Sequence, residues 1–265
     1  MAGQCCGRPK LSDFGLNTDD PSVFSRAQYE KIPKILFIIY RVVIALYIFG
    51  ITVAYLINQI EFFGGVLFVY LTNLGFFVFF FYLVMAAVTA VADTWILRTR
   101  TIEEVGIRHK IQCLLFNITL NVNIIVTLIY WSFLYDPSVS FFYDFHVHSF
   151  TTIVSLLDLF LTAMPVRFLH LIYPMGFGIA YLIMTLIYWG AGGVTRLGDY
   201  IYSFINYTES PGLAAGVACG VLIGVVLVQL LVWGLYKLRM WMWVRCSGDG
   251  RIVQSEDPGK MEEGL

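Results

Sequence analysis

A threonine and a histidine lie near the ends of two different apolar stretches of this chain. Thr72 sits in the run Val69-Tyr-Leu-Thr-Asn73, and His148 opens a second apolar run shortly after His146. A hydroxyl beside an imidazole is the minimum for an activated nucleophile, with the imidazole as general base. A threonine in a helix more often bonds back to the carbonyl four residues earlier, and an interfacial histidine is more often simply hydrated. The two residues therefore leave an ester-attacking pair and a structural role both open.

Three further polar residues could support such a pair. Asn73 follows the threonine directly, and Asn121 could orient a substrate or donate to an oxyanion, although asparagines in apolar helices more often tie helices together. Asp144 could reach His148 at a spacing of four residues if the helix begins that early. His146 competes with His148 for the role of base.

The sequence does not favour a metal, cofactor or nucleic-acid binding site. The chain has only 4 histidines, and His146 and His148 would project to opposite sides of a helix, so we expect no metal site. A phosphate-binding loop and a basic domain are both absent from the sequence, so we expect no cofactor and no nucleic-acid partner.

The composition requires a lipid environment. Hydrophobic residues make up 58% of the 265 residues and charged residues 13%, with a mean hydropathy of +0.75. A soluble domain carries about 25% charged residues, and a core of this length could not bury so much apolar surface. Membrane lipids are therefore the expected surroundings of most of the chain.

Apolar runs long enough to cross a bilayer predict an all-α bundle of six transmembrane helices. The expected organisation is a polar tail at 1–34, a transmembrane domain at 35–236 and a second polar tail at 237–265. The fourth and fifth runs are nearly fused, and a proline and an arginine at 165–167 separate them, since both are unfavourable inside a membrane helix. The six runs are Ile35–Ile57, Val66–Val91, Ile111–Leu134, Val147–Val166, Leu169–Gly190 and Leu213–Tyr236.

Basic residues predict the orientation. Of the 17 Lys and Arg residues, all but Arg41 and Arg196 fall in the tails and in the second and fourth loops, which share the cytoplasmic side when both termini are cytoplasmic. Asn206, in the sequon Asn-Tyr-Thr, then lies in an outer loop and predicts a glycosylation site. Cys5 and Cys6 are a candidate palmitoylation site, with free cysteines as the alternative. The sequence does not distinguish the plasma membrane from an endomembrane.

Two charges lie inside the predicted spans at similar depth. Arg41 is seven residues above Lys34, roughly 10 Å into the first span, and Asp158 is nine residues from Arg167, roughly 13 Å from the same face. Because an unpaired charge at that depth would be costly, we expect Arg41 and Asp158 to form a buried ion pair. A packing role and a role in substrate or proton handling both fit such a pair.

Several short motifs follow one another along the chain: Tyr70-Leu-Thr-Asn-Leu-Gly75, Phe116-Asn-Ile-Thr-Leu120, Tyr130-Trp-Ser-Phe-Leu134, His148 with Asp158, Pro165-Val-Arg-Phe-Leu-His170, Gly192-Gly193 with Gly198, and Gly234-Leu-Tyr-Lys-Leu-Arg239. In their order and spacing they resemble the rolling stone family, and the resemblance extends from the first span to Arg239. It implies a multi-pass membrane protein linked to myoblast fusion. A thinner resemblance, around Tyr70-Leu-Thr72 and His148, is to the androgen-induced and androgen-dependent membrane threonine hydrolases, which cleave fatty acid esters of hydroxy fatty acids. That resemblance implies Thr72 as nucleophile and His148 as base.

Two functions follow from these observations, and the sequence alone does not decide whether the protein is an enzyme. One is a hydrolase of lipid esters that acts from the outer leaflet, with Thr72 and His148 as its catalytic residues. The other is a non-catalytic membrane protein that organises cell–cell fusion. The distance between the Thr72 hydroxyl and the His148 ring separates the two, because only the first requires contact between them.

Overall fold

The computed structural model describes residues 11–96, 104–137, 140–196 and 198–246, and every regular element in these ranges is helical. Five helical stretches there are long and apolar enough to cross a membrane. A helix satisfies all of its own backbone hydrogen bonds, which lipid cannot do for it. Four of the stretches are the helices α1 (Lys34–Phe63), α2 (Leu71–Ile96), α6 (Ile172–Gly190, preceded by a short turn η7 at Phe168–Leu171) and α7 (Pro211–Cys246). The fifth is α3 (Ile107–Ile129), which continues through the π-helical turn η5 (Tyr130–Leu134).

The predicted fourth span has different bounds in the structure. Three consecutive helical segments run from 141 to 161, and this stretch is not among the five that meet the length and hydropathy criteria for a membrane span. The predicted run at Val147–Val166 therefore begins too late and ends too late. The chain is extended from Thr162 to Arg167, because Pro165 disfavours helix in the residue before it. The three segments are α4 (Phe141–Phe145), the π-helical turn η6 (His146–Phe150) and α5 (Thr151–Leu161).

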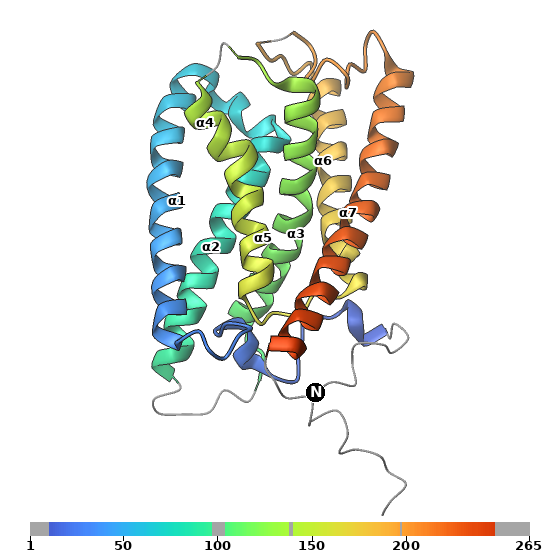
Figure 1. The fold of residues 1–265 in the computed structure, drawn as a ribbon. Coiled ribbons are helices and arrows are strands. Elements are labelled where there is room, and N and C mark those ends of the chain that lie inside the picture. The colour runs from blue at the N-terminus through green and yellow to red at the C-terminus, as the bar shows by residue number, and fades with distance from the viewer. Residues whose placement is uncertain (1–10, 97–103, 138–139, 197, 247–265) are drawn as a thin grey trace, which may run out of the picture.

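Helix α3 lies at the centre of the bundle, packed against α2, α5, α6 and α7 (Figure 1). An unbroken run of its residues, from Phe116 to Val126, is buried, whereas the apolar side chains of α1 and α7 that are exposed, such as Leu46 and Leu227, face outward. The polar side chains of α3 therefore face protein, and the apolar exterior suits lipid.

The described part of the N-terminal polar tail, residues 11–33, folds against the bundle. Two short 3-10 helices, η2 (Leu11–Phe14) and η3 (Pro21–Phe24), pack at the end of the bundle where α1 begins and α7 ends (Figure 1). Phe24 is only 1% exposed and stacks on His109 with ring centroids 5.1 Å apart. The other tail also differs from its prediction, since α7 continues past Tyr236 to Cys246.

Candidate functional site

Thr72 lies in the first turn of α2, on the wall of a small cavity between α2, α3, α6 and α7. The cavity has a volume of about 50 Å³ and a mostly apolar lining, which leaves room for a few water molecules. Tyr202 of the loop between α6 and α7 closes it: its hydroxyl accepts from the Leu71 backbone N–H at 3.1 Å and also contacts the Thr72 side chain. Burial raises the pKa of the Tyr202 phenol, so the hydroxyl stays protonated. Thr72 thus faces a tyrosine of this loop.

The two neighbouring histidines have different surroundings. His146 uses both ring nitrogens: Nδ1 donates to the Phe142 carbonyl at 2.7 Å, and Nε2 accepts from the Tyr47 hydroxyl at 2.7 Å. His148 is 8% exposed, and its Nδ1 is buried without a hydrogen-bond partner. Of the two, only His148 has a ring nitrogen free to act as a base.

His148 does not meet Thr72 in this structure. Its ring lies parallel to the Tyr130 ring, with centroids 3.3 Å apart and an interplanar angle of 3°. Both residues belong to π-helical turns, which often mark functional sites. Within the described residues, no hydrogen bond links Thr72 to His148, and His148 does not line the cavity beside Thr72. The catalytic pair stays a prediction.

The predicted supporting residues hold helices in place. Asp144 accepts a hydrogen bond from the Tyr130 hydroxyl at 2.5 Å, so it reaches His148 only through the stacked tyrosine. Asn73 accepts from Tyr55 of α1 at 2.6 Å and donates to the Leu67 carbonyl at 2.8 Å.

Asn121 joins the central helix to the last one. Its amide donates to Gln229 of α7 at 2.8 Å, and its own Oδ1 has no partner. Gln229 in turn donates to the Arg167 carbonyl at 3.0 Å. This chain of amides binds α3, α7 and the extended segment after α5, as polar residues between membrane helices commonly do.

Arg41 and Asp158 meet in the interior. Arg41 Nη1 lies 2.5 Å from Asp158 Oδ2, and both side chains are 0% exposed. Two tyrosines complete the cluster: Tyr40 donates to Asp158 Oδ1 at 2.6 Å and Tyr82 to Oδ2 at 2.7 Å. The carboxylate therefore receives three charge-assisted or hydroxyl hydrogen bonds, while Nε and Nη2 of Arg41 have none. Sequence reasoning missed both tyrosines, since a tyrosine in an apolar run gives no sign of its partner.

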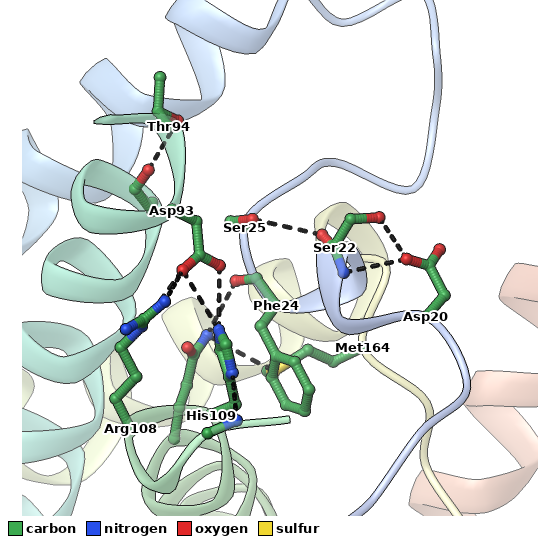
Figure 2. A network of polar contacts seen from close by, with 12 residues as sticks. Asp20, Ser22, Phe24, Ser25, Asp93, Thr94, Arg108, His109 and Met164 are labelled. Atoms are coloured by element: carbon green, nitrogen blue, oxygen red, sulfur yellow. Dashed lines mark hydrogen bonds and ion pairs between the residues drawn. The ribbon is translucent and has the colours of Figure 1, made fainter. Parts of the chain in front are cut away.

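A second charged cluster lies where α2 ends and α3 begins, as Figure 2 shows. Asp93 is 0% exposed and pairs with Arg108 at 2.5 Å and with His109 Nε2 at 3.0 Å. The Gly106 backbone N–H donates to His109 Nδ1 at 3.0 Å, so Nε2 carries the proton given to Asp93. Ser25 of the N-terminal segment also bonds to Asp93, and the cluster thus links that segment to two helices.

Arg239 closes the C-terminal end of α5. It is 1% exposed, and its guanidinium donates to the carbonyls of Leu159, Thr162 and Met164 at 2.7–3.0 Å. These carbonyls lie at and just beyond the end of α5, where a helix has no partners of its own for them and where a cation is favourable. Because Arg239 lies in the stretch predicted to be a polar tail, this role was not predicted.

The remaining predicted sites lie away from these clusters. Asn206 is in the loop between α6 and α7 but only 5% exposed; its Oδ1 accepts from the backbone of Thr208 and Glu209, at 3.0 and 2.9 Å. Cys5 and Cys6 lie outside the described residues. In the described ranges, no three His, Cys, Asp or Glu side chains gather in a way that could hold a metal ion.

An all-α chain with several apolar, membrane-length helices and buried polar ties between them is an integral membrane protein of the multi-pass class. The chain belongs to the rolling stone family, because the family model described as Protein rolling stone matches residues 8–248. It is 28% identical over 246 residues to the protein rolling stone of Drosophila melanogaster, an alignment that covers 86% of this chain and 87% of the fly protein. No solved structure matches the chain.

Proposed function

We propose that this protein crosses the membrane six times, with both termini in the cytosol. The stretch from 141 to 161 supplies the sixth crossing, since its three helical segments follow one another without a break alongside α3 (Figure 1). The start of α1 and the end of α7 lie at the same end of the bundle, as an even number of spans requires. The basic residues gather in the segments at that end, which supports a cytosolic placement.

We further propose that the protein acts without catalysis, as an organiser of cell–cell fusion. The observation that carries this proposal is that the interior polar groups form hydrogen bonds between helices. The Thr72 hydroxyl likewise contacts Tyr202 rather than His148. The family resemblance supports the link to fusion. A cavity of about 50 Å³ is also too small for the ester group and chains of a lipid.

The outer loop between α6 and α7 is the surface that we expect to act. It is folded by side-chain hydrogen bonds, among them Thr185 to Tyr207 at 2.8 Å and Trp189 to Thr208 at 2.9 Å. Val194 in this loop is 62% exposed. A folded loop with an exposed apolar side chain at the outer end of the bundle suits contact with a protein on an apposed cell.

A two-colour fusion assay tests this proposal. Fusion-competent cells that lack the protein would be complemented with wild-type, Thr72→Val or Val194→Asp chains at equal surface amounts. We expect Thr72→Val to restore fusion, because it keeps the shape and removes only the hydroxyl, and Val194→Asp to restore much less. Loss of fusion with Thr72→Val, together with full activity of Val194→Asp, would contradict a non-catalytic role for the outer loop.

A hydrolase that uses Thr72 and His148 is the second candidate. The partnerless Nδ1 of His148 and the cavity beside Thr72 favour it. Such an enzyme would need Tyr202 to leave Thr72 and the two residues to approach within hydrogen-bonding distance. Labelling of the purified protein by a fluorophosphonate probe, retained by Thr72→Ser and lost in Thr72→Ala and His148→Ala, would establish it. Without labelling or turnover of a long-chain ester, this candidate fails.

A further inference from the structure

The N-terminal segment has two parts that differ in how they contact the bundle. Residues 21–28 are largely buried: the Gln28 N–H donates to the Leu161 carbonyl at 2.8 Å, and Gln112 donates to the Phe24 carbonyl at 3.2 Å. None of the four residues of η2 is buried, and Leu11 at its start is 87% exposed. The first part belongs to the core, whereas the second lies on top of it.

Residues 11–17, which we call the strap, are held by hydrogen bonds to their backbone carbonyls and by the charge of Asp13 near His170. Arg167 donates to the carbonyls of Gly15 and Asn17, both at 2.8 Å, and Tyr173 donates to the Phe14 carbonyl. Arg167 lies just before η7, and Tyr173 lies in the first turn of α6. Each of these hydrogen bonds gives modest stabilisation, and Leu16 is the strap residue that packs against the core. We therefore expect the strap to detach without unfolding the helices.

A relay of polar contacts leads from the strap into the bundle. His170 Nε2 lies 3.1 Å from the Gly15 carbonyl, and its Nδ1 lies 3.3 Å from Asn117 Oδ1. Asn117 donates to the Cys113 carbonyl at 2.7 Å and contacts the Cys113 sulfur at 3.6 Å. Cys113 is 2% exposed. The strap thus covers one end of a relay whose other end is a buried thiol.

From this arrangement we propose that residues 11–17 form a releasable strap that controls cytosolic access to the buried polar contacts between His170, Asn117 and Cys113. With the strap in place, the carbonyl of Gly15 lies against His170 Nε2. When the strap lifts, Arg167, Tyr173 and His170 lose their carbonyl partners together, and water reaches these contacts. The device is independent of the proposed outer-loop function, because it lies at the opposite end of the bundle.

The reactivity of Cys113 provides a direct test. In a chain whose other four cysteines are replaced by serine, Cys113 is the only thiol, and its labelling rate with a small maleimide reports strap opening. Tyr173→Phe removes only the hydroxyl that holds Phe14, and we expect it to raise the labelling rate about fivefold. Deletion of residues 2–17 should raise it tenfold or more.

Tyr188→Phe is the matched control. Tyr188 lies on the same helix and donates to a loop carbonyl, that of Val194, at 2.8 Å, but at the outer end. It should leave the rate unchanged. Thermal unfolding of each variant separates strap release from a general loss of structure, and hydrogen exchange at residues 11–17 in the Tyr173→Phe protein supplies a second measurement. Unchanged Cys113 labelling in the deletion, or equal acceleration by Tyr188→Phe, would overturn the strap.

Discussion

Neutralising Asp158 should destabilise this protein more than any surface change of charge. In Asp158→Asn, Arg41 stays in the interior at 0% exposure without a carboxylate. Two of its nitrogens, Nε and Nη2, already have no hydrogen-bond partner, and the rings of Phe37 and Tyr40, 4.9 and 5.6 Å from the guanidinium carbon, are neutral and replace only part of the lost attraction. Removing one partner of a buried pair costs about 3–5 kcal/mol. We expect a loss of that size in the free energy of unfolding.

The double variant Arg41→Met/Asp158→Asn gives the sharper measurement. It removes both charges, so no uncompensated ion is left in the interior, and it should be more stable than the sum of the two single losses predicts. We expect a coupling energy of about 2 kcal/mol or more from the cycle. Tyr40→Phe should cost about 1.5 kcal/mol, because it deletes one hydrogen bond to a charged group while Tyr82 keeps the other.

The assay is thermal or SDS-induced unfolding of the purified protein in detergent, followed by circular dichroism. Asp20→Asn is the control: its pair with Arg26 has side chains 25% and 41% exposed, and such pairs contribute about 1 kcal/mol at most. If Arg41→Met and Asp158→Asn are additive to within about 0.5 kcal/mol, the two charges are energetically independent and the reasoning is wrong.

Three other predictions concern the two termini, Asn206 and Arg239. Epitope tags at either terminus should be detected only after cells are permeabilised, and surface staining of a tag would contradict the six-span topology. Asn206→Gln should abolish any glycosidase-sensitive shift, and because Asn206 is 5% exposed in the folded chain, the glycan must be added before the loop folds; a shift that persists would place Asn117 on the outer side. Arg239→Met should lower the free energy of unfolding by about 2–4 kcal/mol, since it strands three carbonyls, whereas Arg245→Met should change it little.

Hydropathy predicts most of the helices because their lengths are set by the thickness of the membrane. It fails at the end of α5 for a physical reason: Thr162, Ala163 and Met164 carry no charge that would end an apolar run. The helix ends because of Pro165 and because Arg239, 77 residues after Thr162, donates to the Thr162 carbonyl. The folded N-terminal segment was missed for a similar reason. Its ties to Arg167, His170 and Tyr173 join residues more than 150 positions apart, and they reach backbone carbonyls that carry no sequence signal.

Depth arguments predict some contacts and not others. They place Arg41 and Asp158 at the same depth, and because a lone charge there is so costly, equal depth is enough to predict the contact that the structure has. The same argument predicts a similar depth for Thr72 and His148, but a hydroxyl and an imidazole can each find another partner. Their rotation about the helix axes then decides the outcome, and the sequence holds no measure of that rotation.

The three carbonyls that accept hydrogen bonds from Arg239 stay without this partner until the last helix has been synthesised. Leu159, Thr162 and Met164 are synthesised long before Arg239, and at about 5–20 residues per second the wait is on the order of ten seconds. The N-terminal residues 26–28, which bond to the same segment, are made earlier still. The end of the bundle where α1 begins is therefore completed only when the last helix emerges, and a nascent chain that stops short of it presents unfinished backbone to the quality-control machinery of the cell.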